Sequence, residues 1–429
     1  MSHPSDLAGW LDYLEARNRE AIVLGLDRVR QVATRMGLAP ACRVITVGGT
    51  NGKGSICAYL EAMLLEAGLK TGCYTSPHLL RYNERVRIDG QSVSDADLCV
   101  AFAAVESARD DIPLTYFEQG TLAAFWLFRQ QPLDAVVLEV GLGGRLDAVN
   151  IWDADCAVVA GVDLDHQVFL GDTREAIGFE KAGIFRAGRP AVCGDADPPA
   201  SLLRHAEEHG VLLRRLGRDI HTLDQGETWS LRVGEVVYPA LPRPAMAGAH
   251  QLANAACAIA ALQSLRTCLP VPRRALRDGL ARASQPGRFQ VVGRQPLRIL
   301  DVAHNPHAAR ALAANLADMG ARAGQGGRLI AVLALLADKD ARGVIEPLRP
   351  LVQRWHVAGL EVPRGLSGAS LAALLAEMGA DHQCHGQVSE AWHAACREAG
   401  PADTICAFGS FYTVAELMTE IQATPDSHG

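Results

Sequence analysis

Several features that would place a protein in a membrane or on nucleic acid are missing from this chain. No apolar run approaches the ~18 residues that a membrane-spanning helix needs, and residues 1–10 lack the basic-then-apolar pattern of a signal peptide. There is no cluster of basic residues, and the formal net charge of −7 disfavours a polyanionic partner. We therefore expect a cytoplasmic protein with neither a membrane nor nucleic acid as a partner. We also expect it to be a monomer.

The cysteines show no metal-binding or disulfide pattern. Eleven of them are scattered along the chain, with no C-x-x-C pair. Because their number is odd and Cys73, Cys156, Cys257 and Cys406 lie in apolar segments, we expect reduced, buried thiols. The 429 residues, 49% hydrophobic and 21% charged, are typical of a globular protein with two or three domains.

The chain is organised around residues 44–55, where a β-branched run ends in glycines and a lysine before a helical pattern begins. A strand, glycine-rich turn and helix in this order can cradle a phosphate. Backbone N–H groups approach the anion, the helix N-terminus adds a partial positive charge, and Lys53 adds a full one. The strict phosphate-loop motif is not met, because Val47 replaces its first glycine and Gly54 follows the lysine. The alternative is an ordinary strand-to-helix turn with a solvated lysine.

Polar side chains also follow two predicted parallel strands. The apolar run 135–138 ends at Glu139, and the strand predicted over 156–162 is followed by a D-L-D-H string that ends at His166. Carboxyl ends of parallel strands are where α/β sheets bind ligands, so we expect these residues near Lys53. Glu139 supplies the hard oxygen that Mg²⁺ prefers. The alternatives are a solvated glutamate and a structural histidine.

Three further segments are ambiguous by composition. Residues 81–88 fit a solvated loop and hairpin. The T-Y-F-E string at 115–118, before an apolar helix, offers an aromatic pair and a carboxylate that suit a flat, hydrogen-bonding ring, or else core packing with a helix cap. Lys181 lies in a helix predicted over 173–183, where composition alone favours a solvated lysine.

Alternating strands and helices predict an α/β fold with a mostly parallel sheet. Pro286 and Gly287 separate two periodic regions, so we expect one domain over 1–285 and a smaller Rossmann-like domain over 286–429. The smaller domain has no G-x-G-x-x-G motif and therefore no predicted dinucleotide site. The less regular stretch 212–242 is expected to be rich in β-structure.

The motifs, taken together and in order, resemble the Mur ligase superfamily and, within it, the bacterial bifunctional members of the folylpolyglutamate synthase/dihydrofolate synthase branch. The resemblance covers residues 7–421. Its motifs are G-T-N-G-K-G-S at 49–55, S-P-H-L at 76–79, G-L-G-G-R-L-D-A at 141–148, L-D-H at 164–166, E-K-A-G at 180–183, P-G-R-F at 286–289, D-V-A-H-N-P at 301–306 and G-S-F-Y-T-V at 409–414. Val149 departs from the threonine that the branch usually has there.

This resemblance implies a P-loop ATPase domain of the Mur ligase type, carrying a pterin pocket, in residues 1–285. It implies a Rossmann-like glutamate ligase domain in residues 286–429. The implied activity is ATP-dependent amide ligation through an acyl phosphate. L-Glutamate would be added to 7,8-dihydropteroate and to the γ-carboxylate of reduced folates.

The resemblance also implies roles for individual residues. Those implied for ATP are Thr50, Asn51, Gly52, Lys53, Gly54, Ser55, Asn254, Arg288 and Asp301. Two Mg²⁺ ions are implied, one on Ser76 and Glu139, the other on His166 and Lys181, the latter as N6-carboxylysine. Those implied for the pterin are Ile22, Val23, Leu24, Gly25, Thr115, Tyr116, Phe117, Glu118, Leu146, Asp147 and Ala148. Lys53, His166 and Lys181 are implied as catalytic, and His304 as a contact of the incoming glutamate.

Two other functions fit parts of the pattern. One is a ligase of the same superfamily that acts on cell-wall precursors, which should lack the T-Y-F-E segment. The other is a P-loop nucleotide switch that binds partners and ligates nothing. Dependence of ADP release on both a pterin acid and L-glutamate distinguishes the folate ligase from both.

Overall fold

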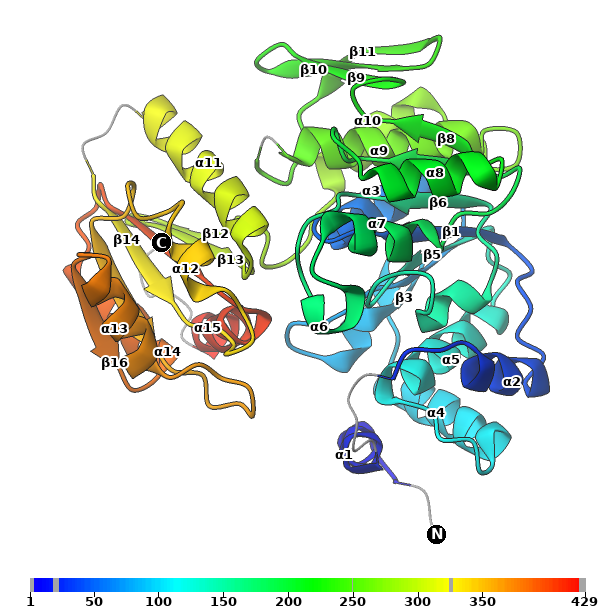
Figure 1. The fold of residues 1–429 in the computed structure, drawn as a ribbon, viewed down its shortest axis with the longest axis horizontal. Helices are drawn as coiled ribbons and strands as arrows, with labels where there is room; N and C mark the ends of the chain where they lie inside the picture. Colours follow the sequence, from blue (N-terminus) through cyan, green and yellow to red (C-terminus); the bar gives the residue numbers. More distant parts are fainter. Residues whose placement is uncertain (1–3, 18–22, 249, 324–326, 424–429) are drawn as a thin grey trace. The chain divides into compact units, whose positions relative to one another are not determined.

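Two separate sheets organise the chain. The computed structural model describes residues 4–17, 23–248, 250–323 and 327–423 (Figure 1). Unit 1 consists of Met1–Ala245 with Leu252–Ser284, and unit 2 of Met246–Gln251 with Gln285–Gly429. Among the described residues, no helix combines the length and the apolar content that crossing a membrane demands.

Unit 1 contains an eight-stranded sheet in the order β4-β3-β2-β5-β1-β6-β7-β8. Strands from β2 to β8 in this order pair in parallel, and β3 and β4 add an antiparallel edge. The strands are β1 (Arg43–Gly48), β2 (Thr71–Tyr74), β3 (Val86–Ile88), β4 (Gln91–Ser92), β5 (Ala135–Glu139), β6 (Cys156–Val159), β7 (Pro190–Cys193) and β8 (Leu212–Arg215). The central strands are buried on both faces, as their continuous apolar runs predict.

Helices cover both faces of this sheet. They are α1 (Leu7–Arg17), α2 (Asp27–Arg35), α3 (Lys53–Glu66), α4 (Asp95–Arg109), α5 (Tyr116–Arg129), α6 (Gln167–Leu170), α7 (Arg174–Ala182), α8 (Ala200–Glu208), α9 (His250–Ser264) and α10 (Arg273–Arg282), with short 3₁₀ turns at Tyr82–Arg85 and Ala148–Ile151. Helix α3 is apolar nearly all round because it lies between the sheet and α10. Gly279 of α10 lets the two backbones approach at Met63.

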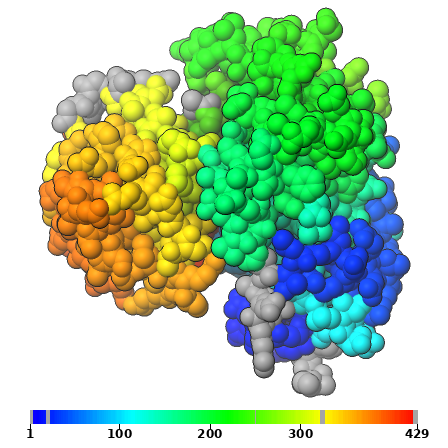
Figure 2. Space-filling model, in the orientation of Figure 1, coloured from blue at the N-terminus to red at the C-terminus, as the bar shows by residue number. Residues whose placement is uncertain are grey.

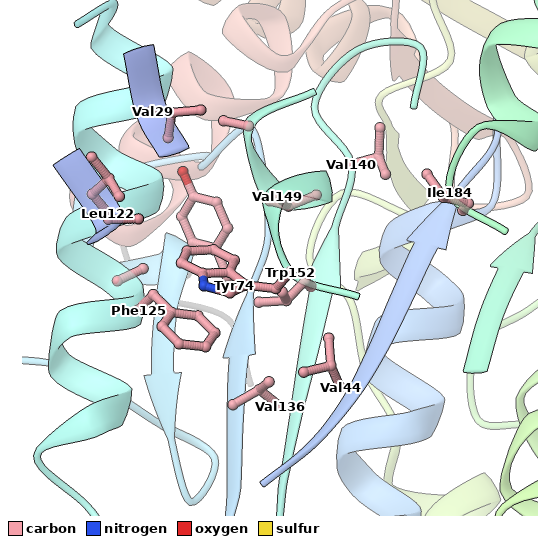
Figure 3. Close-up of a cluster of buried hydrophobic side chains, with 14 of the residues drawn as sticks. Val29, Val44, Tyr74, Leu122, Phe125, Val136, Val140, Val149, Trp152 and Ile184 are labelled. Atoms are coloured by element: carbon pink, nitrogen blue, oxygen red, sulfur yellow. The ribbon is translucent and has the colours of Figure 1, made fainter. Parts of the chain in front are cut away.

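The core of unit 1 includes aromatic rings between α5 and the sheet. Phe125 of α5 stacks on Trp152, with ring centroids 3.6 Å apart and planes 14° apart, and Figure 3 shows Tyr74 and Val136 beside them. Trp152 Nε1 donates to the carbonyl oxygen of Leu38 at 2.7 Å, so its polar atom is satisfied. This packing holds the strands that carry Glu139 and the phosphate loop.

A second, three-stranded antiparallel sheet projects from unit 1. It consists of β9 (Ile220–Asp224), β10 (Thr228–Val233) and β11 (Val236–Pro242), and it forms a green projection in Figures 1 and 2. The β-rich structure expected between residues 212 and 242 is therefore confirmed, although β8 joins the large sheet.

Unit 2 has a six-stranded sheet in the order β12-β13-β17-β14-β15-β16, parallel except for β12. Its strands are β12 (Gln290–Arg294), β13 (Leu297–Asp301), β14 (Leu329–Leu333), β15 (Arg354–Ala358), β16 (His382–His385) and β17 (Thr404–Phe408). Its helices are α11 (Pro306–Ala323), α12 (Ala341–Ile345), α13 (Gly368–Glu377), α14 (Val388–Glu398) and α15 (Phe411–Ala423). The expected α/β fold with a smaller Rossmann-like unit is confirmed.

All eleven cysteines are free, and the four expected to be buried thiols are buried. Burial raises the pKa of Cys156 to about 12, so this thiol stays protonated. The expectation of reduced, buried cysteines is therefore confirmed for these positions.

Candidate active site

The loop between β1 and α3 has the geometry of an anion cradle. Gly49 and Gly52 have φ of +140° and +90°, which few other residues adopt, and Gly52 caps α3 without a side-chain hydrogen bond. Thr50 N–H donates to the carbonyl oxygen of Gly161 at 2.7 Å and anchors the loop to the segment after β6. Lys53 Nζ donates to the carbonyl oxygens of Gly49 and Thr50 at 3.1 and 3.2 Å, so its charge lies over the loop.

Replacing Gly49 with alanine should disrupt this loop. A Cβ at Gly49 would lie 2.9 Å from Ala160 Cβ and 3.0 Å from Ala160 N, and its φ disfavours any side chain. We expect the free energy of unfolding to fall by about 2 kcal/mol. We expect the Kd for ATP to rise about tenfold or more, because the loop amides move. Thermal melting and titration calorimetry measure these two effects.

Gly320→Ala is the matched control, because a Cβ there meets nothing within 4 Å and the residue lies in α11 at ordinary helical φ. It should be neutral or stabilising by about 0.5–1 kcal/mol. Unchanged ATP affinity in Gly49→Ala would contradict the phosphate-loop geometry.

Glu139 and Ser76 are brought together by neighbouring strands. Glu139 is the last residue of β5 and only 4% exposed, and Ser76 follows β2, which pairs with β5. The Glu139 carboxylate accepts a hydrogen bond from Ser76 N–H at 3.0 Å. In the sheet, Glu139 is level with Val47, at the start of the phosphate loop. The residues expected to hold the first Mg²⁺ therefore lie at one edge of the sheet.

Lys181 is buried rather than solvated, so the expectation from composition is wrong at this position. It lies in the last turn of α7 and is 3% exposed. Burial lowers the pKa of Lys181 to about 7, with a further lowering by the charge of Lys53 and opposing contributions from Asp165 and Asp147. The two lysines, 128 positions apart in the sequence, thus act on one another.

The glycine-rich loop after β5 holds α7 in place. Arg145 N–H donates to the carbonyl oxygen of Glu180 at 2.8 Å, and its guanidinium pairs with the Glu180 carboxylate at 2.8 Å. A Cβ at Gly144 would lie 2.8 Å from the Glu180 carbonyl oxygen, so only glycine permits this approach. The loop thereby sets the position of Lys181.

His166 lies in the loop after β6, in a left-handed conformation with φ of +51°. Its side chain is partly exposed, and its Nε2 is 4.0 Å from the carboxylate of Asp165, whose charge acts on Lys181. Within the described ranges, no three His, Cys, Asp or Glu side chains form a group that could hold a metal ion. Each of the two expected Mg²⁺ sites contains only one residue of these four types, Glu139 in the first and His166 in the second. The absence of a three-residue group therefore does not test these sites.

The three segments expected to contact the pterin come together around α2. Gly25 N–H donates to the carbonyl oxygen of Leu146 at 3.5 Å, and Arg28 of α2 pairs with Glu118 of α5 at 2.9 Å. Val23 accepts a hydrogen bond from Arg28 at 2.6 Å. Leu24 and Ala148 are part of the same segments, and Ile22 lies outside the described residues.

The T-Y-F-E string is the first turn of α5, not a loop before it. Thr115 caps the helix through a reciprocal pair of hydrogen bonds with Glu118. The Glu118 carboxylate is therefore already engaged by the Thr115 N–H and by Arg28. Phe117 packs against Gly141, and its ring lies 6.0 Å from that of Tyr74.

Asp147, in the segment 146–148, is near enough to Lys181 for its charge to act on that lysine. Its carboxylate accepts hydrogen bonds from the N–H groups of Leu142 and Val149 at 2.8 and 3.1 Å. Burial nevertheless raises the pKa of Asp147 to about 7, because desolvation outweighs these hydrogen bonds and the attraction of Lys53.

Of the remaining residues expected to contact ATP and glutamate, one lies in unit 1 and three lie in unit 2. In unit 1, Asn254 of α9 lies against the phosphate loop, with Oδ1 2.7 Å from where a Gly52 Cβ would be. In unit 2, the Asp301 carboxylate accepts hydrogen bonds from two backbone N–H groups at 2.8 Å, and burial raises its pKa. Arg288 lies over the ring of Phe411 at 5.5 Å, and His304 is 6.1 Å from the same ring.

Sequence reasoning missed Arg28 and Asp165. Arg28 neutralises Glu118 from 90 positions away, and no local pattern connects them. Asp165 adjoins a predicted residue, and the D-L-D-H string was the available signal for it.

This chain is similar to known proteins over nearly its whole length. Residues 287–411 match the family Mur ligase, glutamate ligase domain. The dihydrofolate synthase/folylpolyglutamate synthase of Escherichia coli (strain K12) is 47% identical over 420 residues, covering 98% of this chain and 96% of that protein. The protein of the same name from Bacillus subtilis (strain 168) is 33% identical over 378 residues, covering 84% and 86%.

Solved structures lead to the same result. E. coli FolC in complex with DHPP and ADP has a TM-score of 0.94 at 46% identity, covering 99% of this chain and 100% of that one. The bifunctional folylpolyglutamate synthase/dihydrofolate synthase from Yersinia pestis, complexed with AMPPNP and Mn ion, has a TM-score of 0.91 at 48% identity, covering 98% and 100%. With this identity over its full length, the chain belongs to the dihydrofolate synthase/folylpolyglutamate synthase family.

Proposed function

We propose that this chain ligates L-glutamate to 7,8-dihydropteroate and to the γ-carboxylate of reduced folates, using ATP and passing through an acyl phosphate. Membership of this ligase family is the basis of the proposal. The observation that supports it most strongly is that Lys53, Glu139 and Lys181 lie close together near the carboxyl ends of the central parallel strands. The solved structure of E. coli FolC in complex with DHPP and ADP supports the choice of dihydropteroate as an acceptor.

A carboxylate is a poor electrophile, so the acceptor acid must first be activated by phosphorylation. The amides of the phosphate loop and Lys53 hold the phosphates of ATP and orient the γ-phosphoryl group. The acceptor carboxylate attacks that phosphorus, ADP leaves, and an acyl phosphate forms. The amine of L-glutamate then attacks the acyl carbon, phosphate leaves, and an amide bond is made.

The donor set at the sheet edge suits Mg²⁺, because the Glu139 carboxylate is a buried hard oxygen donor beside Ser76. One ion held by Ser76 and Glu139, and another held by His166 and Lys181, would neutralise charge on the transferring phosphoryl group. The Y. pestis enzyme, complexed with AMPPNP and Mn ion, supports a requirement for a divalent cation.

We include carbamylation of Lys181 in the proposal. A free amine attacks CO₂, forms an N–C bond and releases one proton, which leaves an anionic carbamate. The lowered pKa of Lys181 keeps much of this amine neutral near pH 7, as the reaction requires. An anion at this position replaces repulsion from Lys53 by attraction and supplies the oxygen ligands that an amine lacks.

The remaining assignments complete the proposal. We assign the pterin to residues 23–25, 115–118 and 146–148, with Ile22 as the adjoining position, and further ATP contacts to Asn254, Arg288 and Asp301. We assign the incoming glutamate to His304 in the ligase domain of residues 286–429. We also propose that the chain is cytoplasmic, in keeping with its free cysteines, and that it works as a monomer.

The function is tested by measuring ADP release with each substrate omitted in turn. We expect ADP release to require both dihydropteroate and L-glutamate, and tetrahydrofolate to replace dihydropteroate as acceptor. Activity with a cell-wall nucleotide-sugar peptide instead would indicate the other branch of the superfamily. ATP turnover that ignores both acceptor and glutamate would indicate a nucleotide switch and contradict the proposal.

A further inference from the structure

Three arginines lie close together in the segment that runs from β2 to β4, and one of them differs from the others. The Arg81 guanidinium pairs with the carboxylate of Asp95 at 2.8 Å, and that of Arg87 pairs with Glu61 at 2.7 Å. Throughout the described part of the chain, no Asp or Glu carboxylate lies within 4.0 Å of the Arg85 guanidinium. Among the described residues, Arg85 is thus a cation without a carboxylate partner.

The Arg85 side chain is nevertheless held firmly. Its Nε donates to Nδ1 of His78 at 2.8 Å. The guanidinium lies 5.0 Å from the ring centroid of Tyr82 and 5.7 Å from that of Tyr116. Aromatic faces attract a cation without neutralising it. Neutral groups therefore fix the direction of a charge that still attracts an anion.

The surroundings of Arg85 place this charge next to the proposed substrate site. On one side, His78 belongs to the same short loop as Ser76, whose N–H donates to Glu139. On the other side, Tyr116 is the first residue of α5 and part of the proposed pterin segment. Arg85 is half-buried as a residue.

The chemistry of the acceptor matches this location. Dihydropteroate has a pterin ring at one end and, at the other, the carboxylate that must meet the γ-phosphoryl group. The Arg85 guanidinium contacts His78, in the loop of Ser76, and lies 5.7 Å from the Tyr116 ring, in the proposed pterin segment. A guanidinium has five N–H donors, and the one on Nε is used by His78, so the others remain for a two-pronged contact with a carboxylate.

We propose that Arg85 recognises the carboxylate of the acceptor and thereby selects acidic pterins over uncharged ones. This inference rests on the proposed function and adds a specificity residue to it. By neutralising the carboxylate and fixing its direction, Arg85 positions the acceptor for attack on ATP.

The test is a pair of binding titrations on the full-length protein with ADP and Mg²⁺ present. The ligands are 7,8-dihydropteroate and 6-hydroxymethyl-7,8-dihydropterin, which lacks the carboxylate. We expect Arg85→Gln to raise the Kd for dihydropteroate about 10–100-fold, the contribution of a charge-assisted pair. The Kd for the carboxylate-free pterin and the Kd for ADP should stay unchanged. Arg81→Gln is the matched control in the same segment, and it should change none of the three.

Two results would overturn the inference. One is an Arg85→Gln variant that binds dihydropteroate as tightly as wild type. The other is an equal loss of affinity for both pterins, which would indicate a structural role only. If Arg85→Gln does not fold, Arg85→Lys is used in the same titrations and judged by the same selective loss. Wild-type protein that binds neither pterin would instead contradict the proposed function itself.

Discussion

Replacing Lys181 with alanine is expected to lower kcat by about 10³-fold or more, the scale for losing an electrostatic group at a reacting phosphoryl. Lys181 is 3% exposed and acts on Lys53 of the phosphate loop, so its removal changes the charge next to the γ-phosphate. If it acts as a carbamate, short carboxylic acids such as formate or acetate should enter the vacated space. They should then restore a measurable part of the activity.

Lys70→Ala is the matched control, because Lys70 is exposed and its side chain makes no contact with the site. Carbon-13 NMR with labelled bicarbonate should show a carbamate carbon in wild type and in Lys70→Ala, but not in Lys181→Ala. Full activity of Lys181→Ala, or its loss without any rescue and without a carbamate signal in wild type, would refute the assignment.

The Lys181 amine also predicts the direction in which activity changes with pH. Only the neutral amine reacts with CO₂, and burial next to Lys53 lowers the pKa of Lys181 to about 7. The neutral fraction is therefore high above pH 7 and falls as the pH drops through about 7, and carbamate-dependent activity should fall with it. An ordinary lysine, with a pKa of ~10.4, would place this loss far higher. The acid-rescued Lys181→Ala enzyme should lack this limb of the pH profile.

Glu139→Gln should have the second largest effect. Glutamine has the same shape and can still accept the hydrogen bond from Ser76 N–H, so the fold should be kept. It removes the negative charge at the end of β5, where we propose a Mg²⁺ ion. We expect kcat/KM to fall about 10²–10³-fold. The Mg²⁺ concentration for half-maximal rate should rise at least about tenfold.

A magnesium titration of the initial rate measures this effect. Glu207→Gln is the control, because this glutamate is exposed on α8 and should leave the curve unchanged. An unaltered Mg²⁺ requirement in Glu139→Gln, at any level of activity, would show that Glu139 does not hold the ion.

The T-Y-F-E string illustrates where local patterns stop being informative. The alternatives of a pterin contact and a helix cap were both open, and the structure shows that Glu118 caps α5 and pairs with Arg28. Helix propensity predicted α5, but the predicted start lay after the T-Y-F-E string, whereas the observed helix begins at Tyr116. Aromatic residues in a first turn are weak signals of a helix start. The edge strand β16 likewise carries little sequence signal, since it is short and mostly polar.

Sequence patterns were enough to predict the α/β class, the strand–turn–helix of the phosphate loop and the presence of Glu139 at a strand end. These features depend on the hydrophobic period, on the spacing of glycines and on the succession of strands and helices along the chain, all of which are patterns between residues near one another in sequence. The burial of Lys181 within the influence of Lys53 could be seen only in the folded chain. The same is true of the arginines: among the described residues, Arg81 and Arg87 pair with carboxylates and Arg85 does not. Burial and charge pairing are set by segments far apart in the chain, so composition near each residue carries no record of them.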